Sequence, residues 1–484
     1  MSIKRLSLLL LLFSVACQSA QPPPAPAEAL ERPNIIMIVV DDLRWDEMGV
    51  AGHPYLETPH IDRLAAEGAY FSKAFHTVPL CSPNRATILT GQYPSRHGII
   101  DNVSRARASH RLETFPRAIQ RHGYETAFLG KWHMGNDPTP RPGFDLWVAI
   151  PGQGRSINPE LYENGQIGVV EGYLTDILTE RALSFIDQER EGPFMLYLAH
   201  KAIHPDIQQL DDGSADPSTS LGYIPAPRHR GRYADKEFPL RPNAVGSLDE
   251  LTGKPALRRA LQRKYAESNE PLQADQKTIR DRAEMLLAAD EGLGRLMSRL
   301  EESGKLANTA IILTSDNGFF YGEHALTVER RLPYEESIRT PLLIRYPPLI
   351  AAGTRIDSLV ASVDLAPTAL DLAGTPIGEH IQGRSLLPLL RGNSQGWRDS
   401  ILIEFYTYEN PFPWLLDMDY RALRTGRYKY IHWMQHPDEN ELYDLLEDPY
   451  EVRNLFADPA MEAVKQELQK KLRSAVLHAS GLEE

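Results

Sequence analysis

The segment Asn34-Ile35-Ile36-Met37-Ile38-Val39-Val40-Asp41-Asp42 decides the class of fold. An uninterrupted apolar run that is rich in β-branched residues is typical of a strand buried on both faces. Residues 126–129, 194–199 and 310–314 repeat this pattern, and residues 285–300 place their apolar side chains on one face of a helix. Strand-like runs that alternate with helical segments predict an α/β fold, in which helices sandwich a large and mainly parallel sheet.

The pattern changes near residue 398. Residues 420–433 and 442–445 look like short antiparallel strands, and residues 461–477 like a closing helix. We therefore predict a main domain over residues 33–397 and a smaller C-terminal α+β subdomain over residues 398–484, built on a short antiparallel sheet. Within the main domain, residues 205–245 are rich in Pro, Asp, Gly and Arg without a clear period, which predicts a long surface insertion and a candidate wall of a substrate site.

The N-terminus has the pattern of an export signal. Lys4 and Arg5 precede an apolar run and small residues, so residues 1–16 read as a signal peptide that is too short to span a membrane. The Ala16-Cys17 junction resembles that of bacterial lipoproteins, which would make Cys17 a lipidated N-terminus. Ser14 stands where Leu is usual, so cleavage without lipid stays open. Residues 17–32 read as a Pro/Ala tether.

This pattern predicts a protein exported to the periplasm or the outer membrane, with membrane contact through an N-terminal lipid only. The composition is otherwise that of a globular protein, with 42% hydrophobic residues in 484. Its 52 basic residues against 65 acidic ones give a net charge of −13, which argues against a nucleic-acid partner. Two cysteines cannot form a disulfide framework or a Cys-rich zinc site.

Polar clusters follow all four predicted strands. Because ligands of open α/β sheets bind beyond the carboxyl ends of the strands, these clusters point to one cleft. Such residues are also ordinary turn formers and helix caps, so no cluster alone decides the question. The residues of interest are Asp41, Asp42, Lys131, His133, His204, Asp316 and Asn317.

The chemistry of these groups suits an oxyanion beside a hard cation. Carboxylate and amide oxygens favour Ca²⁺ or Mg²⁺ over zinc. Lys131 and His133 are two residues apart, so in an extended segment they would point to the same side. Together with His204 they would place positive charge and titratable rings next to the metal. We therefore expect a site for sulfate or phosphate.

Cys81 is the candidate nucleophile, in the segment Cys81-Ser82-Pro83-Asn84-Arg85. Ser82 suits a helix cap and Pro83 a first helical turn, which predicts that Cys81 lies at a helix N-terminus, where an anion is favoured. The helix is expected to stop at Gly91. A lone cysteine is more often a buried structural residue than a reactive one, and that interpretation remains open from the residues alone.

The segment 81–85 with Leu89-Thr90-Gly91 resembles the signature of type I sulfatases of the alkaline phosphatase-like superfamily. The resemblance covers nearly all of the chain after residue 32. In that family a maturing enzyme oxidises the cysteine to formylglycine, an aldehyde whose hydrate is the nucleophile. Further matching motifs are Gly130-Lys131-Trp132-His133, Ser315-Asp316-Asn317-Gly318, Gly322-Glu323-His324, Tyr334-Glu335-Glu336 and Leu442-Tyr443-Asp444-Leu445.

The resemblance implies one Ca²⁺ per chain, with Mg²⁺ as the weaker alternative. Its implied ligands are Asp41, Asp42, Asp316, Asn317 and the formylglycine at Cys81. The same resemblance assigns catalytic roles to further residues: holding the hydrated aldehyde, binding sulfate, acting as base on the remaining hydroxyl of the sulfated intermediate and helping to protonate the leaving alcohol. These are, in that order, Arg85, Lys131, His133 and His204.

One position departs from the family pattern. Many members carry a second sulfate-binding lysine before Tyr-Glu-Glu, and this chain has Glu329-Arg330-Arg331-Leu332-Pro333 there. Arg330 lies four residues before Tyr334 and is the expected replacement. Arg331 is the alternative, and two solvated loop charges are the remaining interpretation.

The motifs around Tyr334 and Leu442 look most like those of N-acetylglucosamine-6-sulfatases and other glycosaminoglycan or algal polysaccharide sulfatases. The resemblance therefore implies a sulfatase that acts on a sulfated carbohydrate. Two alternatives remain. A phosphonate or phosphate monoester hydrolase of the same superfamily would use much the same cleft, and a surface polysaccharide-binding lipoprotein could retain the fold with a dead site.

Overall fold

The four predicted strands are neighbours at the centre of a ten-stranded sheet. They are β11 (Thr309–Ser315), β1 (Asn34–Val40), β8 (Phe194–His200) and β4 (Glu125–Lys131), in this spatial order. All three contacts between them are parallel, and β5 (Leu146–Ile150) adds a further parallel strand beside β4. The predicted parallel α/β sheet is therefore confirmed.

Both edges of the sheet carry short strands that the sequence patterns did not reveal, and antiparallel pairs occur among them. On one side lie β14 (Leu342–Arg345), β2 (Ala69–Phe71) and β15 (Thr354–Ile356), and on the other β6 (Glu160–Glu163) and β7 (Gln166–Val169). β14 runs antiparallel to β11, and β6 antiparallel to β5. These strands are short, so their sequence signal is weak.

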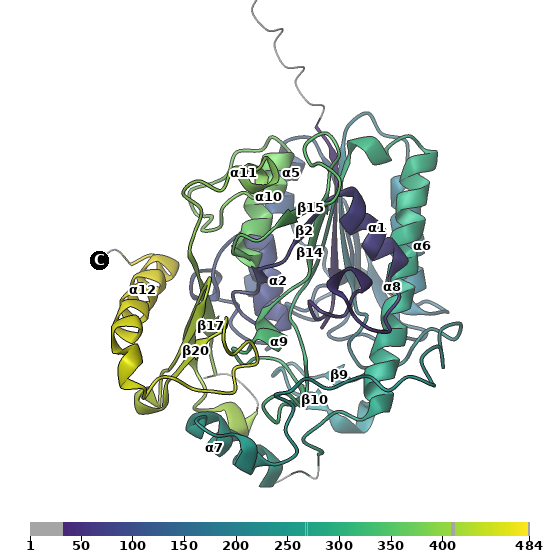
Figure 1. Cartoon of the computed structure of the whole chain (residues 1–484). Helices are drawn as coiled ribbons and strands as arrows, with labels where there is room; N and C mark the ends of the chain where they lie inside the picture. The colour runs from purple at the N-terminus through teal and green to yellow at the C-terminus, as the bar shows by residue number, and fades with distance from the viewer. Residues whose placement is uncertain (1–31, 267, 269, 408–411, 483–484) are drawn as a thin grey trace, which may run out of the picture. The chain divides into compact units, whose positions relative to one another are not determined.

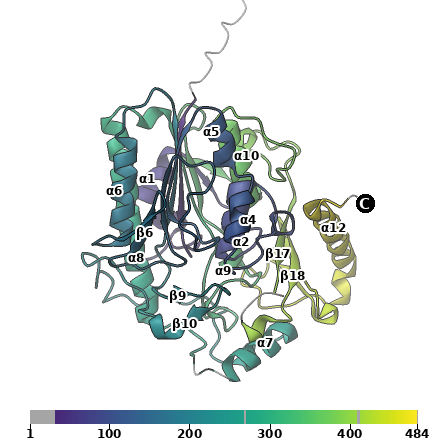
Figure 2. The same cartoon turned by 180° about the vertical axis from the view of Figure 1, so that it is seen from behind.

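Helices cover both faces of the sheet, as Figures 1 and 2 show. Ile36, Ile38 and Val40 point into one apolar core, whereas the alternate residues of β1 point into the other. The first core is covered by α1 (Pro59–Glu67), α6 (Leu174–Ile186) and α8 (Gln276–Glu302). The second is covered by α2 (Cys81–Thr90), α5 (Phe115–Arg121), α10 (Leu365–Leu372) and α11 (Leu387–Leu390).

The C-terminal part contains the expected antiparallel sheet. Its strands, in order, are β17 (Ser400–Phe405), β18 (Tyr420–Thr425), β19 (Tyr428–Trp433) and β20 (Glu441–Asp444). The predicted closing helix is α12 (Glu462–Ser480), which packs Leu468 and Leu472 against this sheet. The other face joins a core that includes Phe75 and Leu80, so apolar packing is continuous across the boundary predicted at residue 397, which stays a prediction.

The predicted insertion consists mostly of turns. It contains only the short strands β9 (Gln208–Gln209) and β10 (Ala215–Asp216), which pair with each other, and it is followed by α7 (Pro255–Ala266). Tyr233 and Phe238 anchor it, since both side chains are buried in the core on the α8 side of the sheet.

Further short helices and strands lie between these elements in the chain. They are α3 (Pro94–His97), α4 (Ala106–Arg111), α9 (Glu335–Ile338), β3 (Ala74–Phe75), β12 (Phe320–Tyr321), β13 (Thr327–Glu329) and β16 (Val360–Ala361).

The computed structural model describes residues 32–266, 268, 270–407 and 412–482. The predicted signal peptide, with Lys4 and Arg5, and the tether with Cys17 up to residue 31 therefore lie outside the described residues. Within the described part, no helix combines the length and the apolar character that crossing a bilayer requires.

Candidate active site

The carboxyl ends of β1 and β11 bring four predicted metal ligands together. Asp41 and Asp42 directly follow β1, and Asp316 and Asn317 follow β11, whose last residue pairs with Val40. All four side chains are fully buried. The amide N–H of Asp42 donates to Asp316 Oδ1 (3.1 Å), and Asn317 Nδ2 donates to Asp42 Oδ1 (2.6 Å).

Three oxygens of this group have no hydrogen-bond partner among the described residues. They are Asp41 Oδ1, Asp42 Oδ2 and Asn317 Oδ1. Buried carboxylate and amide oxygens without partners are costly unless a ligand satisfies them. Ligand atoms of Asp41, Asp42 and Cys81 also lie within 4.8 Å of one another. The donor set fits a hard divalent cation such as Ca²⁺ or Mg²⁺.

Cys81 is the first residue of α2, as expected for a helix N-terminus. The predicted cap was wrong in detail, because Leu80 occupies the N-cap position and Ser82 lies inside the helix, where its hydroxyl donates to the carbonyl of His133. The helix stops at Gly91, which adopts a left-handed φ of 66° as predicted. Burial raises the pKa of the Cys81 thiol to about 12, so the unmodified side chain is a protonated and poor nucleophile.

Three cations face the three carboxylates. Arg85 Nε donates to Asp316 Oδ2 (2.8 Å), the ammonium of Lys131 contacts Asp41, and Arg330 Nε lies 3.4 Å from Asp42 Oδ1. Burial acts to raise the pKa of Asp316, but the charges of Arg85 and Lys131, together with hydrogen bonds to the carboxylate, lower it below its usual value.

The pKa of Asp41 behaves differently from that of Asp316. Burial, with the nearby charge of Asp316, raises the pKa of Asp41 to about 7. A divalent cation would offset the cost of ionising Asp41. The three named cations already balance the three carboxylates, so a bound cation would leave the pocket with excess positive charge, which favours an anionic substrate.

His204 lies beyond β8 and is neutral at physiological pH. Arg330 Nη2 lies 2.9 Å from His204 Nε2, and a guanidinium can only donate, so Nε2 accepts. Nδ1 therefore has the proton and donates to the carbonyl of Pro205 (2.9 Å). Burial and the charges of Lys131 and Arg330 lower the pKa of His204 well below its usual value.

A buried ion pair holds the loop that contains His204. Lys201 Nζ donates to the carbonyl of His204 (2.9 Å) and lies 2.7 Å from Asp206 Oδ1. Asp206 in turn accepts from the amide and the hydroxyl of Ser156. Nothing in the strand pattern indicated this support, since the partners come from separate loops.

His133 is oriented by a residue that sequence reasoning missed. Gln209 Nε2 donates to the carbonyls of Asn102 (3.1 Å) and Gly213 (3.2 Å), which fixes the orientation of its amide. Gln209 Oε1 therefore faces His133 and accepts from Nε2. His133 Nδ1 then has a lone pair and no partner among the described residues, which suits a general base.

The structure shows the protonation state of the His133 ring and corrects the predicted backbone conformation at this residue. Burial and the charge of Lys131 lower its pKa, so the ring is neutral. The expected extended segment is absent from this position, because β4 ends at Lys131 and His133 adopts a left-handed φ of 66°. A turn, and not strand alternation, therefore places this ring. Gln209 belongs to β9 of the predicted insertion, whose sequence contains no periodic signal.

The two adjacent arginines point in different directions. Arg330 faces His204 and Asp42, whereas Arg331 Nη1 pairs with Glu329 Oε1 at 2.6 Å and its guanidinium lies 4.6 Å from the Phe412 ring centroid. Both arginines are buried, with 8% and 7% of their surface exposed. The interpretation of both as solvated loop charges was therefore wrong.

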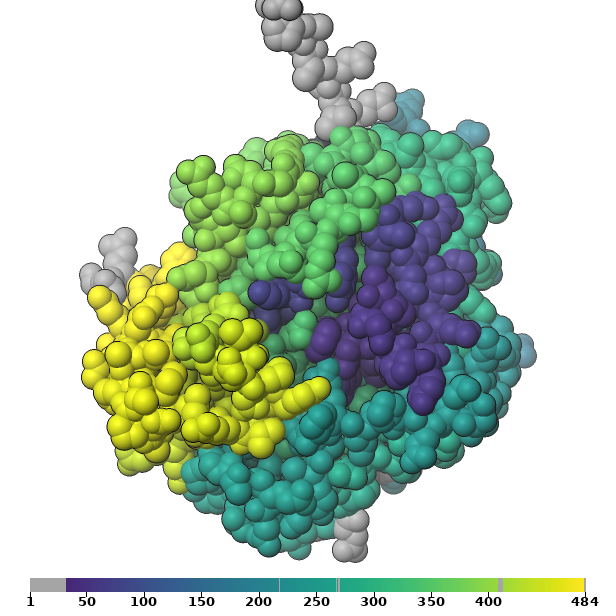
Figure 3. All heavy atoms as spheres, in the orientation of Figure 1, coloured from purple at the N-terminus to yellow at the C-terminus, as the bar shows by residue number. Residues whose placement is uncertain are grey.

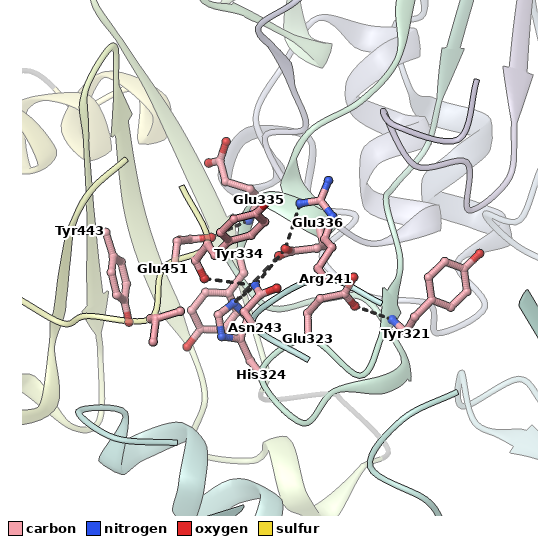
Figure 4. Close-up of polar contacts among 12 residues, drawn as sticks. Arg241, Asn243, Tyr321, Glu323, His324, Tyr334, Glu335, Glu336, Tyr443 and Glu451 are labelled. Atoms are coloured by element: carbon pink, nitrogen blue, oxygen red, sulfur yellow. Dashed lines mark hydrogen bonds and ion pairs between the residues drawn. The ribbon is translucent and has the colours of Figure 1, made fainter. Parts of the chain in front are cut away.

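A second buried cluster surrounds the Gly322-Glu323-His324 and Tyr334-Glu335-Glu336 motifs, as Figure 4 shows. Asn243 Nδ2 donates to Glu336 Oε1 (3.0 Å) and lies 3.1 Å from His324 Nε2. Glu336 also pairs with Arg241 (3.2 Å). Glu451 accepts from the amide of Glu335 (2.8 Å) and contacts the ammonium of Lys429. Arg241 and Lys429 supply positive charge to these acids, and the cluster joins the C-terminal part to the site loops.

Two family models match the chain. One, described as sulfatase, matches residues 33–375, and one described as N-sulphoglucosamine sulphohydrolase, C-terminal, matches residues 322–477. The first match covers well over half of the 484 residues.

Individual proteins agree with these matches. A Bacteroides thetaiotaomicron protein named N-acetylglucosamine-6-O-sulfatase is 32% identical, with 92% of this chain and 86% of that protein covered. A solved structure of a protein in complex with its substrate, D-glucosamine-2-N,6-O-disulfate, is 31% identical, has a TM-score of 0.79 and covers 93% of this chain and 99% of its own. The phosphonate monoester hydrolase of Agrobacterium radiobacter is 22% identical (TM-score 0.71, covering 93% and 96%), which shows a shared fold alone.

Proposed function

Since the chain belongs to the sulfatase family and is a sulfuric ester hydrolase, we propose that it removes a 6-O-sulfate from a glucosamine unit of a sulfated glycan. The substrates named for the two relatives at 31–32% identity support this choice of sugar. With a divalent cation bound, the excess positive charge of the pocket would favour an anionic substrate.

The observation that supports the mechanism best is the place of Cys81. It lies at the start of α2, within 4.8 Å of carboxylate oxygens of Asp41 and Asp42, yet its thiol is protonated and unreactive. Oxidation of Cys81 to formylglycine by a maturing enzyme would supply a hydrated aldehyde as the nucleophile. Arg85 would help to hold that group, because its guanidinium spans Asp316 and the carbonyl of Lys131.

Asp41, Asp42, Asp316 and Asn317 would hold a Ca²⁺, which would supply positive charge to the sulfate oxygens. Lys131 and Arg330 would bind the same oxygens by charge-assisted hydrogen bonds. His133 Nδ1, which has no partner among the described residues, would accept a proton from the remaining hydroxyl of the sulfated intermediate.

His204 would give a proton to the leaving alcohol. In the free protein its pKa is lowered by burial and by two cations, so it must first be charged. A bound sulfate brings negative charge next to the ring and opposes the effect of these cations. Bound substrate would therefore raise the pKa of His204 above its value in the free protein and increase the share of the proton-donating form.

The N-terminal pattern supports export of the enzyme, with Cys17 as the residue that would bear a lipid. Export would place the enzyme outside the cytoplasm, where it could reach extracellular polysaccharide. Labelling of the protein with a fatty acid analogue, compared with a Cys17→Ala variant, would test the anchor separately from the activity.

The proposed activity is tested by producing the chain with a formylglycine-generating enzyme. Mass spectrometry of the peptide that contains Cys81 should detect the aldehyde, and Cys81→Ala should lose several orders of magnitude in kcat. Paired nitrophenyl sulfate and nitrophenyl phosphate substrates separate a sulfatase from a phosphate or phosphonate monoesterase. Release of sulfate from 6-O-sulfated N-acetylglucosamine tests the sugar. An unmodified Cys81 that coexists with glycan binding and no turnover would instead support the binding-protein alternative.

A further inference from the structure

A cleft of about 620 Å³ opens beside His204 and Arg330. Distant parts of the chain line it: the insertion through Gln209, α7 through Lys264, β13 through Thr327, and the segment around Trp414. Figures 1 and 2 show α7 below the C-terminal sheet, and Figure 3 shows the teal and the yellow parts of the chain adjoining at the surface. Arg263 Nη2 donates to the carbonyl of Trp414 (3.1 Å), which holds these two walls together.

Several polar atoms in the cleft wall lack a partner among the described residues. They are Gln153 Oε1, Thr327 Oγ1 and Arg331 Nε, and the three residues are exposed by only 7%, 5% and 7%. Buried polar groups of this kind are normally satisfied. Three of them in one cleft, next to the catalytic residues, indicate a place for a polar ligand and not merely a gap in packing.

Arg331 is held in position at the inner end of this cleft. Its backbone has a left-handed φ of 68°, its amide donates to the carbonyl of Pro79 (2.9 Å), and its own carbonyl accepts from the hydroxyl of Tyr420 (2.7 Å). A bulky residue adopts such a conformation only where its surroundings impose it. Glu329 accepts from Nη1, and Nε, which has no partner within the described part of the chain, is left as a donor for an oxyanion.

Lys264 supplies a second cation. Its ammonium lies 5.4 Å from the Trp414 ring centroid and donates to the carbonyl of Thr327 at 3.3 Å. Among the described residues, the carboxylate paired with it is that of Glu270, which is 3.5 Å away and more than half exposed. An ammonium has three donors, so this contact leaves capacity for a ligand.

We propose that this cleft binds a second acidic group of the substrate, a sulfate or a carboxylate, through Arg331 and Lys264. Trp414 and Phe412 also line the cleft and add apolar surface to its wall. The inference rests on the proposed glycan sulfatase activity and narrows it to multiply charged glycans. Arg330 then binds the sulfate that is removed, and Arg331 binds a second negatively charged group on the same sugar or on the next one.

The test compares kcat/KM for matched substrates with and without the second charge. One pair is 6-O-sulfated N-sulfoglucosamine against 6-O-sulfated N-acetylglucosamine. The other is a 6-O-sulfated disaccharide with a uronic acid or with a neutral sugar as its neighbour. The first pair tests whether the cleft binds a second sulfate, and the second pair tests whether it binds a carboxylate. We expect the wild type to prefer the charged member of one pair about tenfold, the effect of one charge-assisted hydrogen bond.

Lys264→Met and Arg331→Gln should each abolish most of this preference, and Arg331→Lys should keep part of it. Lys470→Met, on an exposed position of α12, is the matched control and should leave the ratio unchanged. Salt at about 0.5 M should weaken the preference in the wild type. Thermal unfolding of each variant establishes that it is folded, and if Arg331→Gln does not fold, Lys264→Met decides.

Equal efficiency of the wild type on both members of both pairs would overturn the inference, as would a preference that survives in folded Lys264→Met. Either result leaves the proposed function intact, because the singly sulfated sugars are still hydrolysed. A wild type that hydrolyses none of the four compounds but cleaves nitrophenyl sulfate would instead refute the proposed glycan substrate.

Discussion

Replacing Arg330 by alanine tests whether its guanidinium binds the sulfate that is removed. The side chain is buried, with Nη2 2.9 Å from His204 Nε2 and Nε 3.4 Å from Asp42 Oδ1. A charge-assisted contact that is strengthened in a water-poor pocket is worth about 2–4 kcal/mol in the transition state. Arg330→Ala should therefore lower kcat/KM by about 30- to 900-fold.

The same substitution should also change the pH dependence through His204. After burial and Lys131, the charge of Arg330 is the next cause that lowers the pKa of His204. A general acid works only while protonated, so the rate on sugar sulfates should fall as the pH rises through this pKa. Removing Arg330 raises the pKa of His204, so the fall should move to higher pH. Nitrophenyl sulfate has a leaving group that needs little protonation, so its rate of hydrolysis should not fall as the pH rises through the pKa of His204.

The assay measures pH profiles of kcat/KM for both substrates in wild type, Arg330→Ala, Arg330→Lys and His204→Ala. Arg330→Lys should recover part of the loss, because a lysine commonly occupies this place in the family. His204→Ala should affect the sugar sulfate far more than the aryl sulfate. Arg355→Ala is the control, since its side chain is 62% exposed at the edge of the sheet. Wild-type rates for Arg330→Ala on both substrates would refute the reasoning.

Three further changes have expected outcomes. Asp316→Ala should lose bound metal and activity together, and Ca²⁺ but not Zn²⁺ should restore the chelated wild type, as elemental analysis and kinetics would establish. Gln209→Leu removes the acceptor that fixes the tautomer of His133, so kcat should fall on the order of 10²-fold with little change in KM, while Gln209→Glu should keep the tautomer and raise the pKa of the ring. Burial lowers the pKa of His97 to about 3, so between about pH 6.5 and pH 3 only the unfolded state binds a proton at this residue. As the pH is lowered through this range, His97 should therefore reduce the free energy of unfolding by up to about 1.4 kcal/mol per pH unit. His97→Gln should make the free energy of unfolding less dependent on pH, which denaturation at a series of pH values would measure.

The strands could be predicted because their signal is local. Residues 34–42 form a buried run followed by two carboxylates, and this suffices to place Asp41 and Asp42 at the end of a central strand. Cys81 was found in the same way, because a helix start and a short motif coincide. The edge strands were missed because runs of three or four residues have no reliable period.

Residues that act across the fold could not be predicted from spacing. Gln209 reaches His133 from an insertion without periodicity, and Lys264 reaches the cleft from a helix that no motif indicated. Backbone conformation hides further contacts. His133 and Arg331 both have a left-handed φ, which is uncommon for residues other than glycine, and strand alternation therefore assigns the side chain of His133 incorrectly.

The consecutive arginines show how such a conformation can divide one short segment between two tasks. β13 ends at Glu329, whose carboxylate accepts from the amide of Arg330 (2.7 Å) and from the guanidinium of Arg331 (2.6 Å). That carboxylate therefore holds Arg331 in the cleft while it fixes the backbone from which Arg330 reaches His204. The charge next to the reaction and the charge in the cleft share one anchor, so a change at Glu329 would disturb catalysis and substrate choice together, whereas changes at either arginine separate them.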